Sequence, residues 1–283
     1  MINKKGNIQN FLGCNAAYDQ AEIVIFGAPY DSTTSNRPGA RFGPAAMRGE
    51  SYGLETYSPY LDRDLEDDVK VYDAGDLELY GKAENVLQVI EKATSEIITD
   101  NKIPLMLGGE HLVTLGAVKA MAKKHQNLHI IHFDAHTDLR DEYLGEKLSH
   151  ATVMRRCHDI LGDGRIFQYG IRSGTRDEFY WAKKHIANGV QPKMVAELSE
   201  LNVPFYFTLD LDVLDPSIFP GTGTPEAGGI NFEELRHNLM FLQNLNIVGC
   251  DIVELAPNYD PSGVSTAVAC KVLREILLIL NKA

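Results

Sequence analysis

The chain has 283 residues, of which 44% are hydrophobic and 23% charged, so it can form one large core and is not a small disulfide-held scaffold. Its net charge of −12 argues against nucleic acid and anionic membranes as partners, because both bind clustered Lys and Arg side chains.

Short apolar runs rich in β-branched residues alternate with longer segments of helical period. In chain order, strands are predicted at 23–27, 69–72, 103–107, 129–134, 165–169, 205–210 and 247–253, with a weaker candidate at 193–195. Helices are predicted at 83–99, 112–124, 151–161, 177–186, 232–242 and 264–280. This alternation predicts an α/β fold with a mostly parallel sheet that is covered by helices on both sides.

No linker-like or low-complexity stretch divides the chain, so we expect a single domain over residues 1–283. In open parallel sheets, ligands bind beyond the carboxyl ends of the strands. The strand ends are therefore the place to look for chemistry.

Four of the predicted strands end in residues that bind metals or cations. The residues are His111 after the third strand, Asp134, His136 and Asp138 at the fourth, Asp210 and Asp212 at the sixth, and Glu254 at the seventh. In extended chain, residues two apart point to the same side, so the acidic and histidine side chains at the fourth and sixth strand ends can converge. His111 follows a glycine pair, Gly108 and Gly109, which permits an unusual backbone path at a strand-to-helix turn.

Leaving Glu254 aside, this cluster contains two histidines and four carboxylates. Four carboxylates cannot stay ionised together at the end of an apolar sheet without strong positive charge nearby. Mixed carboxylate and imidazole ligands suit a divalent metal such as manganese, and no thiolate indicates structural zinc. Six such ligands exceed what one catalytic ion takes from a protein, so two ions that share bridging carboxylates fit better.

These motifs resemble the ureohydrolase family of arginases and agmatinases. The resemblance is carried by Gly108-Gly109-Glu110-His111, by Asp134-Ala135-His136-Thr137-Asp138 and by Asp210-Leu211-Asp212-Val213-Leu214-Asp215-Pro216. It extends to 27–31, 37–44, 223–226 and 251–254, and it covers the chain from about residue 23 to 280.

The resemblance implies a three-layer α/β/α fold, two Mn²⁺ ions per chain and a homo-oligomer, either a trimer or a hexamer. It also implies two ligand sets, one for each ion, and Asp134 and Asp210 belong to both sets and bridge the two ions. The first set is His111, Asp134, Asp138 and Asp210, and the second is Asp134, His136, Asp210 and Asp212.

The catalytic residues that we expect are Asp138, His150 and Glu254. Two metal ions activate water as a nucleophile, and Asp138 would carry the proton of that water to the departing amine. Glu254 is expected to bind the planar guanidinium of the substrate. His150 lies where the family has a histidine suited to proton transfer, and Ser149 would cap the helix that follows. For Glu110, a role behind the metal ligands and a plain helix-terminus role remain open.

The substrate is less well defined. Where arginases resemble one another in an Asn two residues after their Asp-x-His-x-Asp motif, this chain has Arg140, which argues against arginine. The segments 224–226 and 37–44 look more like those of agmatinases and favour agmatine. Asp141, Glu142 or Glu146 could attract the distal ammonium of agmatine, but a solvated loop is the simpler interpretation of these three residues. Arg140 could instead bind the carboxylate of 4-guanidinobutyrate. N-aminopropylagmatine and a formimino compound are further alternatives.

Two other classes remain as alternatives. A metal-dependent amine deacetylase of related fold would need a His-His pair, which the sequence lacks. A non-enzymatic metal-binding protein would need a lost ligand, and none of the six is lost.

The four cysteines, Cys14, Cys157, Cys250 and Cys270, form no CxxC pair, so we expect free buried thiols in a reducing compartment. Residues 1–10 lack the apolar segment of a secretory signal, and the longest apolar run, 276–280, is too short to span a bilayer. We therefore expect a cytoplasmic protein.

Overall fold

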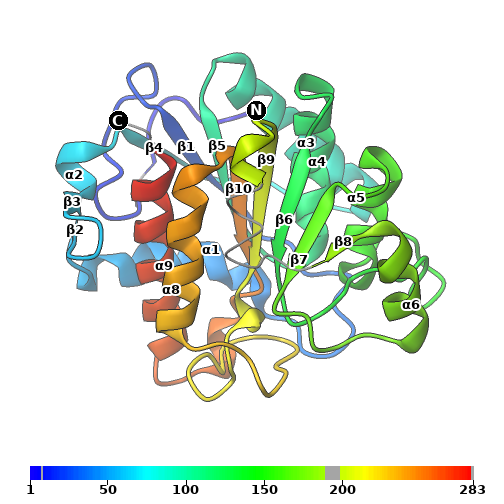
Figure 1. The fold of residues 1–283 in the computed structure, drawn as a ribbon. Helices are drawn as coiled ribbons and strands as arrows, with labels where there is room; N and C mark the ends of the chain where they lie inside the picture. The colour runs from blue at the N-terminus through cyan, green and yellow to red at the C-terminus, as the bar shows by residue number, and fades with distance from the viewer. Residues whose placement is uncertain (8, 189–197, 282–283) are drawn as a thin grey trace.

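The central feature of the computed structural model, which describes residues 1–7, 9–188 and 198–281, is a parallel β-sheet with helices on both faces (Figure 1). The strands of this sheet are β1 (Ile23–Ala28), β4 (Val71–Asp76), β5 (Ile103–Gly108), β6 (His129–Phe133), β7 (Ile166–Tyr169), β8 (Ala187–Asn188), β9 (Pro204–Asp210) and β10 (Asn246–Val253). Their order is β4-β1-β5-β10-β9-β6-β7-β8, and each of the seven pairings is parallel. A separate antiparallel pair is formed by β2 (Tyr57–Ser58) and β3 (Arg63–Asp64).

The α-helices are of very different lengths. They are α1 (Gly43–Glu50), α2 (Leu65–Asp68), α3 (Ala83–Thr99), α4 (Thr114–Lys124), α5 (Val153–Leu161), α6 (Arg176–His185), α8 (Phe232–Phe241) and α9 (Val264–Leu280). Short 3₁₀ turns matter for the site because they follow strand or loop ends: η3 (His111–Val113), η4 (His150–Thr152) and η5 (Leu211–Val213).

Alternate residues of each buried strand enter two different hydrophobic clusters. In β1, Ile23 and Ile25 belong to the cluster that contains α1, α8 and α9, whereas Val24 and Phe26 belong to the cluster that contains α3, α4 and α5. Both faces of the sheet are therefore buried, which explains the continuous apolar runs in the sequence. Figure 1 displays α8 and α9 on one side of the sheet and α3, α4 and α5 on the other. The predicted three-layer α/β/α fold is confirmed.

The predicted boundaries agree best where a long amphipathic period runs between clear end signals. The helices predicted at 83–99 and 264–280 match α3 and α9 exactly. The helices predicted from 112 and 151 begin two residues later, because η3 and η4 occupy the first turn. The weaker strand candidate at 193–195 lies outside the described residues.

The sequence prediction did not include β2, β3, β8, α1 or α2, and it ended β4 too early. Strand β4 runs to Asp76, beyond the predicted end at 72, although Asp and Gly are disfavoured in strands. The extension is possible because Arg48 donates hydrogen bonds to both oxygens of the buried Asp73 carboxylate, at 2.8 and 3.0 Å. Arg48 belongs to α1, which was not predicted because its eight residues show no long apolar period.

The four cysteines are buried and free, as predicted. Among the described residues, no helix is both long enough and apolar enough to cross a membrane.

The turn after β5 depends on a close approach between two backbone segments. The amide of Glu110 donates a hydrogen bond of 2.7 Å to the carbonyl of Tyr30, and a Cβ atom on Gly109 would overlap that carbonyl oxygen. Gly109 has no left-handed backbone angle, so it is required here for space, not for the unusual backbone path that the sequence suggested. This contact places His111 at the edge of the sheet.

We predict that Gly109→Ala lowers the free energy of unfolding by about 1–3 kcal/mol, because the added methyl group must push two packed backbone segments apart. Denaturant unfolding of the variant measures this. Gly53→Ala is the matched control, since a Cβ at Gly53 meets nothing within 4 Å. Equal stability of the two variants would contradict the prediction.

Candidate metal centre

The polar residues singled out in the sequence gather at the carboxyl edge of neighbouring strands. His111 follows β5, Asp134 follows β6, Asp210 ends β9, and Glu254 follows β10. The four strands are adjacent in the sheet, in the order β5-β10-β9-β6. Parallel strands end at one edge, so residues far apart in sequence meet there.

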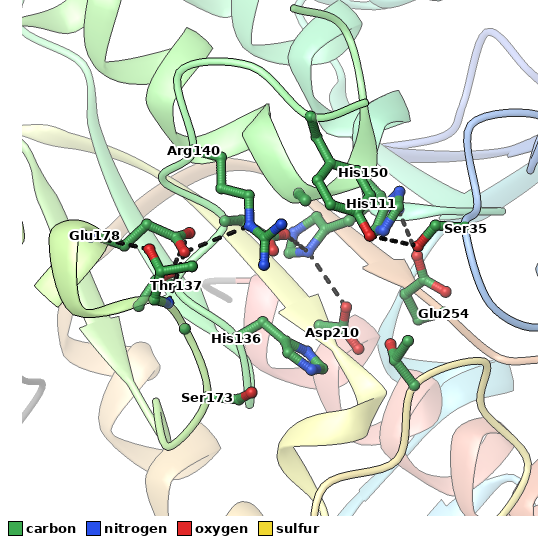
Figure 2. Close-up of a pocket in the computed structure, with 16 residues that line it drawn as sticks. Ser35, His111, His136, Thr137, Arg140, His150, Ser173, Glu178, Asp210 and Glu254 are labelled. Carbon is green, nitrogen blue, oxygen red and sulfur yellow. Dashed lines mark hydrogen bonds and ion pairs between the residues drawn. The ribbon is translucent and has the colours of Figure 1, made fainter. Parts of the chain in front are cut away.

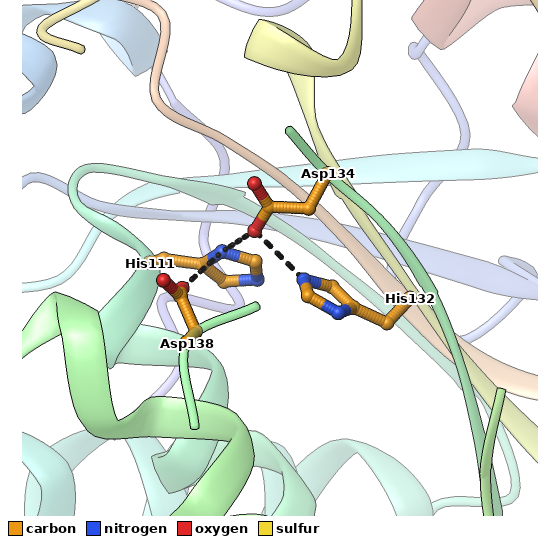
Figure 3. A group of neighbouring side chains, drawn as sticks. All are labelled: His111, His132, Asp134 and Asp138. Carbon is orange, nitrogen blue, oxygen red and sulfur yellow. Dashed lines mark hydrogen bonds and ion pairs between the residues drawn. The ribbon is translucent and has the colours of Figure 1, made fainter. Parts of the chain in front are cut away.

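The first group of side chains surrounds the Nδ1 atom of His111. This nitrogen lies 3.0 Å from Oδ2 of Asp134, 3.3 Å from Oδ2 of Asp138 and 3.3 Å from Oδ2 of Asp210. Figure 3 displays His111, Asp134 and Asp138 pointing toward one another. All four side chains are buried. They are the first ligand set implied by the family resemblance.

The other ring nitrogen of His111 is held by a hydrogen-bonded chain. Its Nε2 lies 3.0 Å from the hydroxyl of Thr208, and that hydroxyl donates a 2.6 Å hydrogen bond to Oδ1 of Asp251. Because the Thr208 proton is used on Asp251, Nε2 of His111 must be the donor in their contact. The lone pair of Nδ1 then faces the carboxylates, as a metal ligand requires.

The second group lies around His136. Its Nδ1 is 3.0 Å from Oδ2 of Asp212 and 3.4 Å from Oδ1 of Asp134. Asp210 is joined to this group because the backbone amide of Asp212 donates a 2.9 Å hydrogen bond to Oδ1 of Asp210. Asp134 thus takes part in both groups, one through each of its carboxylate oxygens.

The polar residues at the ends of β6 and β9 do not converge through the simple alternation of side chains along a strand. Strand β6 ends at Phe133, and Asp138 has a φ of 53°, in the left-handed region that side chains other than glycine rarely adopt. Glu254 has the same kind of backbone, with a φ of 66°. Two of the three expected catalytic residues are therefore held in strained conformations, which occur mainly at functional sites.

His132 is a site residue that the sequence reasoning missed. Its Nε2 lies 2.7 Å from Oδ2 of Asp134, on the opposite side from His111 (Figure 3). Its Nδ1 lies 3.1 Å from Nε2 of Gln168, an amide nitrogen that also donates to the carbonyl of Thr137 at 2.8 Å. Since an amide NH₂ can only donate, Nδ1 accepts and Nε2 carries the proton. His132 is therefore a hydrogen-bond donor that orients Asp134, and it has no lone pair free for a metal.

The donor set fits divalent cations. Nδ1 of His111 and Oδ2 of Asp212 are buried and have no hydrogen-bond partner among the described residues. The carboxylates of Asp134, Asp138, Asp210 and Asp212 form ion pairs only with histidines in the described part of the chain. Four buried carboxylates with so little positive charge require cations between them. Imidazole and carboxylate ligands without a thiolate suit manganese and related divalent ions.

The crowding of buried carboxylates also shifts the pKa values in the cluster. Burial acts to lower the pKa of His136, but the carboxylates of Asp212 and Asp134 outweigh it and raise the pKa to about 12. Burial and the charge of Asp134 raise the pKa of Asp138 to about 6. Burial and the charge of Asp212 raise the pKa of Asp210 well above its usual value. Protons therefore supply the positive charge of the cluster whenever metal ions do not.

Glu254 is fixed next to the first group. Its Oε1 accepts a 2.8 Å hydrogen bond from the backbone amide of His111, and its side chain points into the pocket (Figure 2). Burial and the nearby carboxyl of Glu110 raise the pKa of Glu254 well above its usual value. A cationic group in the pocket would offset both effects.

A loop at Thr33 connects Glu110 to His150. The Glu110 carboxyl, whose pKa burial raises to about 7, accepts hydrogen bonds of 3.0 Å from the amide of Thr33 and from the hydroxyl of Thr34. The Thr33 hydroxyl accepts from the amide of His150 at 3.1 Å, and the Thr33 carbonyl accepts from Nδ1 of His150 at 3.0 Å. Ser149 is the N-cap of η4, as predicted. Nε2 of His150 is left for the pocket, and the Glu110 carboxyl is hydrogen-bonded to this loop.

The two groups open into a cavity of about 280 Å³. Sixteen residues line it, among them Arg140, Tyr143, Ser173 and Glu178 (Figure 2). The Arg140 guanidinium lies over the Tyr143 ring, 4.5 Å from its centroid, and Nε of Arg140 is 3.5 Å from Oε2 of Glu178.

The acidic residues that follow Arg140 are not part of this lining, in agreement with the solvated-loop interpretation. Asp141, Glu142 and Glu146 are exposed, and Asp141 pairs with Arg156 at 2.6 Å. They follow Asp138 closely in sequence, but the chain turns outward after Arg140. The carboxylate that does line this part of the pocket is Glu178, which comes from α6.

Comparisons with known proteins agree with this geometry. A model of the arginase family matches residues 21–279, a range that contains every residue of both groups. The chain is 48% identical to an agmatinase of Bacillus anthracis over 276 residues, which is 95% of each chain. It is 38% identical to the mitochondrial guanidino acid hydrolase of Homo sapiens over 278 residues, 92% of this chain and 79% of the other. The crystal structure of agmatine ureohydrolase of Thermoplasma volcanium has a TM-score of 0.87 at 34% identity and covers 97% of this chain and 94% of that one.

We predict that Mn²⁺ binding releases protons and tightens as pH rises. The proton on His136, with a pKa near 12, must leave before the ring can bind a metal, so each proton released raises the affinity by about tenfold per pH unit. Calorimetric titration in two buffers of different ionisation enthalpy measures the release. A binding heat that is the same in both buffers would contradict it.

Proposed function

The chain belongs to the arginase family, and we propose that it hydrolyses agmatine to putrescine and urea with two Mn²⁺ ions per chain. The observation that carries the proposal is the convergence of two histidines and four carboxylates beside Glu254, at the bottom of one polar cavity. The similarity to agmatinases over nearly the whole chain supports agmatine as the substrate.

Two ligand sets are assigned to the ions. One ion would be held by His111, Asp134, Asp138 and Asp210, and the other by Asp134, His136, Asp210 and Asp212. The short distances from Nδ1 of His111 and Nδ1 of His136 to the carboxylates support this assignment. Divalent ions held there supply Lewis acidity, which lowers the pKa of water and makes a nucleophile available at neutral pH.

Glu254 is assigned to the guanidinium of the substrate. One of its oxygens is fixed by the amide of His111, and the other is left for a ligand. A guanidinium offers a planar set of N–H donors to a carboxylate, and its charge stabilises the ionised form of Glu254. The reacting carbon would thereby be held close to His111 and its ligand group.

Asp138 is assigned to proton transfer during the reaction. Hydrolysis of a guanidinium cation gives urea and the amine as its ammonium ion, so both protons of the attacking water end on the amine nitrogen that leaves, and Asp138 would carry one of them. The carboxyl of Asp138 lies in the first group and also lines the cavity that would hold the substrate. A carboxylate in this position can accept a proton from the water and return it to the amine.

His150 is assigned to proton exchange between the pocket and solvent. Burial lowers its pKa to about 4, so its ring is neutral at pH 7. Because the proton on Nδ1 is donated to the Thr33 carbonyl, Nε2 is the atom that can accept a proton from the pocket.

One observation favours a second candidate substrate. Arg140 lines the cavity, and a guanidinium there can bind the carboxylate of a guanidino acid such as 4-guanidinobutyrate. Glu178 opposes this, because it lies 3.5 Å from Arg140 and offsets its charge. We therefore keep agmatine as the preferred substrate.

Location and assembly are part of the same proposal. Free cysteines are typical of a reducing compartment, which supports the cytoplasm. Large exposed aromatic side chains, including Phe42, Tyr52 and Tyr80, supply apolar surface for the trimer or hexamer that we propose.

The test of the function is urea release by the manganese-loaded protein from agmatine, arginine, 4-guanidinobutyrate and N-aminopropylagmatine, measured side by side. We expect the highest kcat/KM with agmatine. A clear preference for 4-guanidinobutyrate would favour the second candidate, and urea from none of the four would refute both.

We predict that Thr33→Val lowers kcat about fivefold without changing manganese content, because the variant removes the hydroxyl that holds the His150 amide, worth about 1 kcal/mol. Thr33→Ser keeps the hydroxyl and should behave as the wild type. Steady-state kinetics and elemental analysis measure both. If Thr33→Val has the wild-type kcat, this hydroxyl does not position His150.

We predict that Arg140→Met raises kcat/KM for agmatine about fivefold. The substitution removes a positive charge that repels the distal ammonium of agmatine by about 1 kcal/mol, and it frees Glu178 to face that ammonium. Under the same change, any turnover of 4-guanidinobutyrate should fall. Kinetics with both substrates measure this. A large loss of agmatine turnover would mean that Arg140 itself contacts the substrate productively.

A further inference from the structure

A second cluster of metal-binding side chains lies outside the pocket. It consists of His158 in α5, Asp163 in the loop after α5, and His185 at the end of α6. Nε2 of His158 and Nδ1 of His185 both lie 2.7 Å from the same oxygen, Oδ1 of Asp163. The three potential ligand atoms are within 4.8 Å of one another. The family comparison and the proposed reaction do not account for this cluster.

The two imidazole rings are held in place by Trp181. The ring of His158 meets the Trp181 ring edge-on, with centroids 4.6 Å apart, and the ring of His185 stacks on it at 4.4 Å with planes 22° apart. Rings that are already packed lose little freedom when they bind an ion, which favours binding.

We propose that His158, Asp163 and His185 form a third metal site, which binds one zinc-type divalent ion per chain and is separate from the two-ion centre. Two imidazoles and one carboxylate suit Zn²⁺ or Ni²⁺ better than Mg²⁺ or Ca²⁺, which prefer oxygen ligands. Asp163 is 65% exposed on its side chain, so water can complete the coordination. The ion replaces the protons that now lie between the two rings and Asp163, and the rings must move apart slightly to admit it.

The hydrogen bonding of His158 limits the affinity. When Nε2 binds the ion, the ring proton moves to Nδ1, which is buried and has no hydrogen-bond partner in the described part of the chain. A buried unpaired N–H weakens binding by about tenfold to a hundredfold. We therefore expect micromolar affinity, not the much tighter binding of a closed structural zinc site.

The position of the site gives it a structural consequence. Helix α5 continues from η4, which carries His150, and α6 begins just after Thr175 and carries Glu178. His150, Thr175 and Glu178 all line the catalytic cavity. An ion at the third site would therefore connect the far ends of two helices whose near ends form one wall of that cavity.

The test uses Trp181, the single tryptophan of the chain, as a fluorescent reporter. Protein saturated with Mn²⁺ is titrated with Zn²⁺ while the emission of Trp181 is followed, and the metals bound at equilibrium are counted by equilibrium dialysis and elemental analysis. We expect a saturable change in emission at micromolar Zn²⁺ and one zinc per chain, with the manganese content unchanged.

Three variants separate this site from other zinc binding. Asp163→Asn and His185→Gln should each weaken zinc binding at least tenfold, whereas His237→Gln, at an exposed histidine of α8, should leave it unchanged. The proposal is overturned if the emission does not saturate, if Asp163→Asn binds zinc like the wild type, or if zinc enters only as manganese leaves. Urea release is not part of this test, so its result and that of the proposed function are independent.

Discussion

Four carboxylates buried at one edge of an apolar sheet are the constraint on which the rest of the site depends. Asp134, Asp138, Asp210 and Asp212 repel one another, and no Lys or Arg among the described residues pairs with them. Such a group is stable only when cations or protons lie between its members. The fold keeps the carboxylates together because the strands that carry them are locked by a core on both faces. Metal binding is thus a consequence of electrostatic strain that the sheet imposes.

The tautomers of three histidines determine what each ring offers to these carboxylates and to the pocket. In each of three histidines, one ring nitrogen is committed to a hydrogen bond inside the protein, and this sets the other nitrogen: Thr208 sets His111, Gln168 sets His132, and Thr33 sets His150. His111 and His150 present a lone pair, whereas His132 presents a proton to a carboxylate. The same kind of side chain is thereby suited to bind a metal, to accept a proton or to support a carboxylate, according to its partner on the far side of the ring.

Much of the fold, and the convergence of polar residues at the strand ends, could be predicted because both follow from local sequence patterns. Continuous apolar runs reveal buried strands, and the acidic residues at their ends stand out, as in the case of Asp210. The contribution of His132 could not be predicted, because it depends on Gln168, a partner from a neighbouring strand. The pairing of Arg140 with Glu178 could not be predicted either, because Glu178 lies in α6, a distant part of the chain. Strand β4 was predicted too short because Arg48, the partner of Asp73, is 25 residues away.

The most direct test of the account is a crystal structure of the manganese-loaded protein with anomalous scattering measured at the manganese edge. The account predicts two anomalous peaks per chain at the carboxyl edge of the sheet, one beside Nδ1 of His111 and one beside Nδ1 of His136, with Asp134 in contact with both. A single peak, or a peak bound by His132, would contradict it.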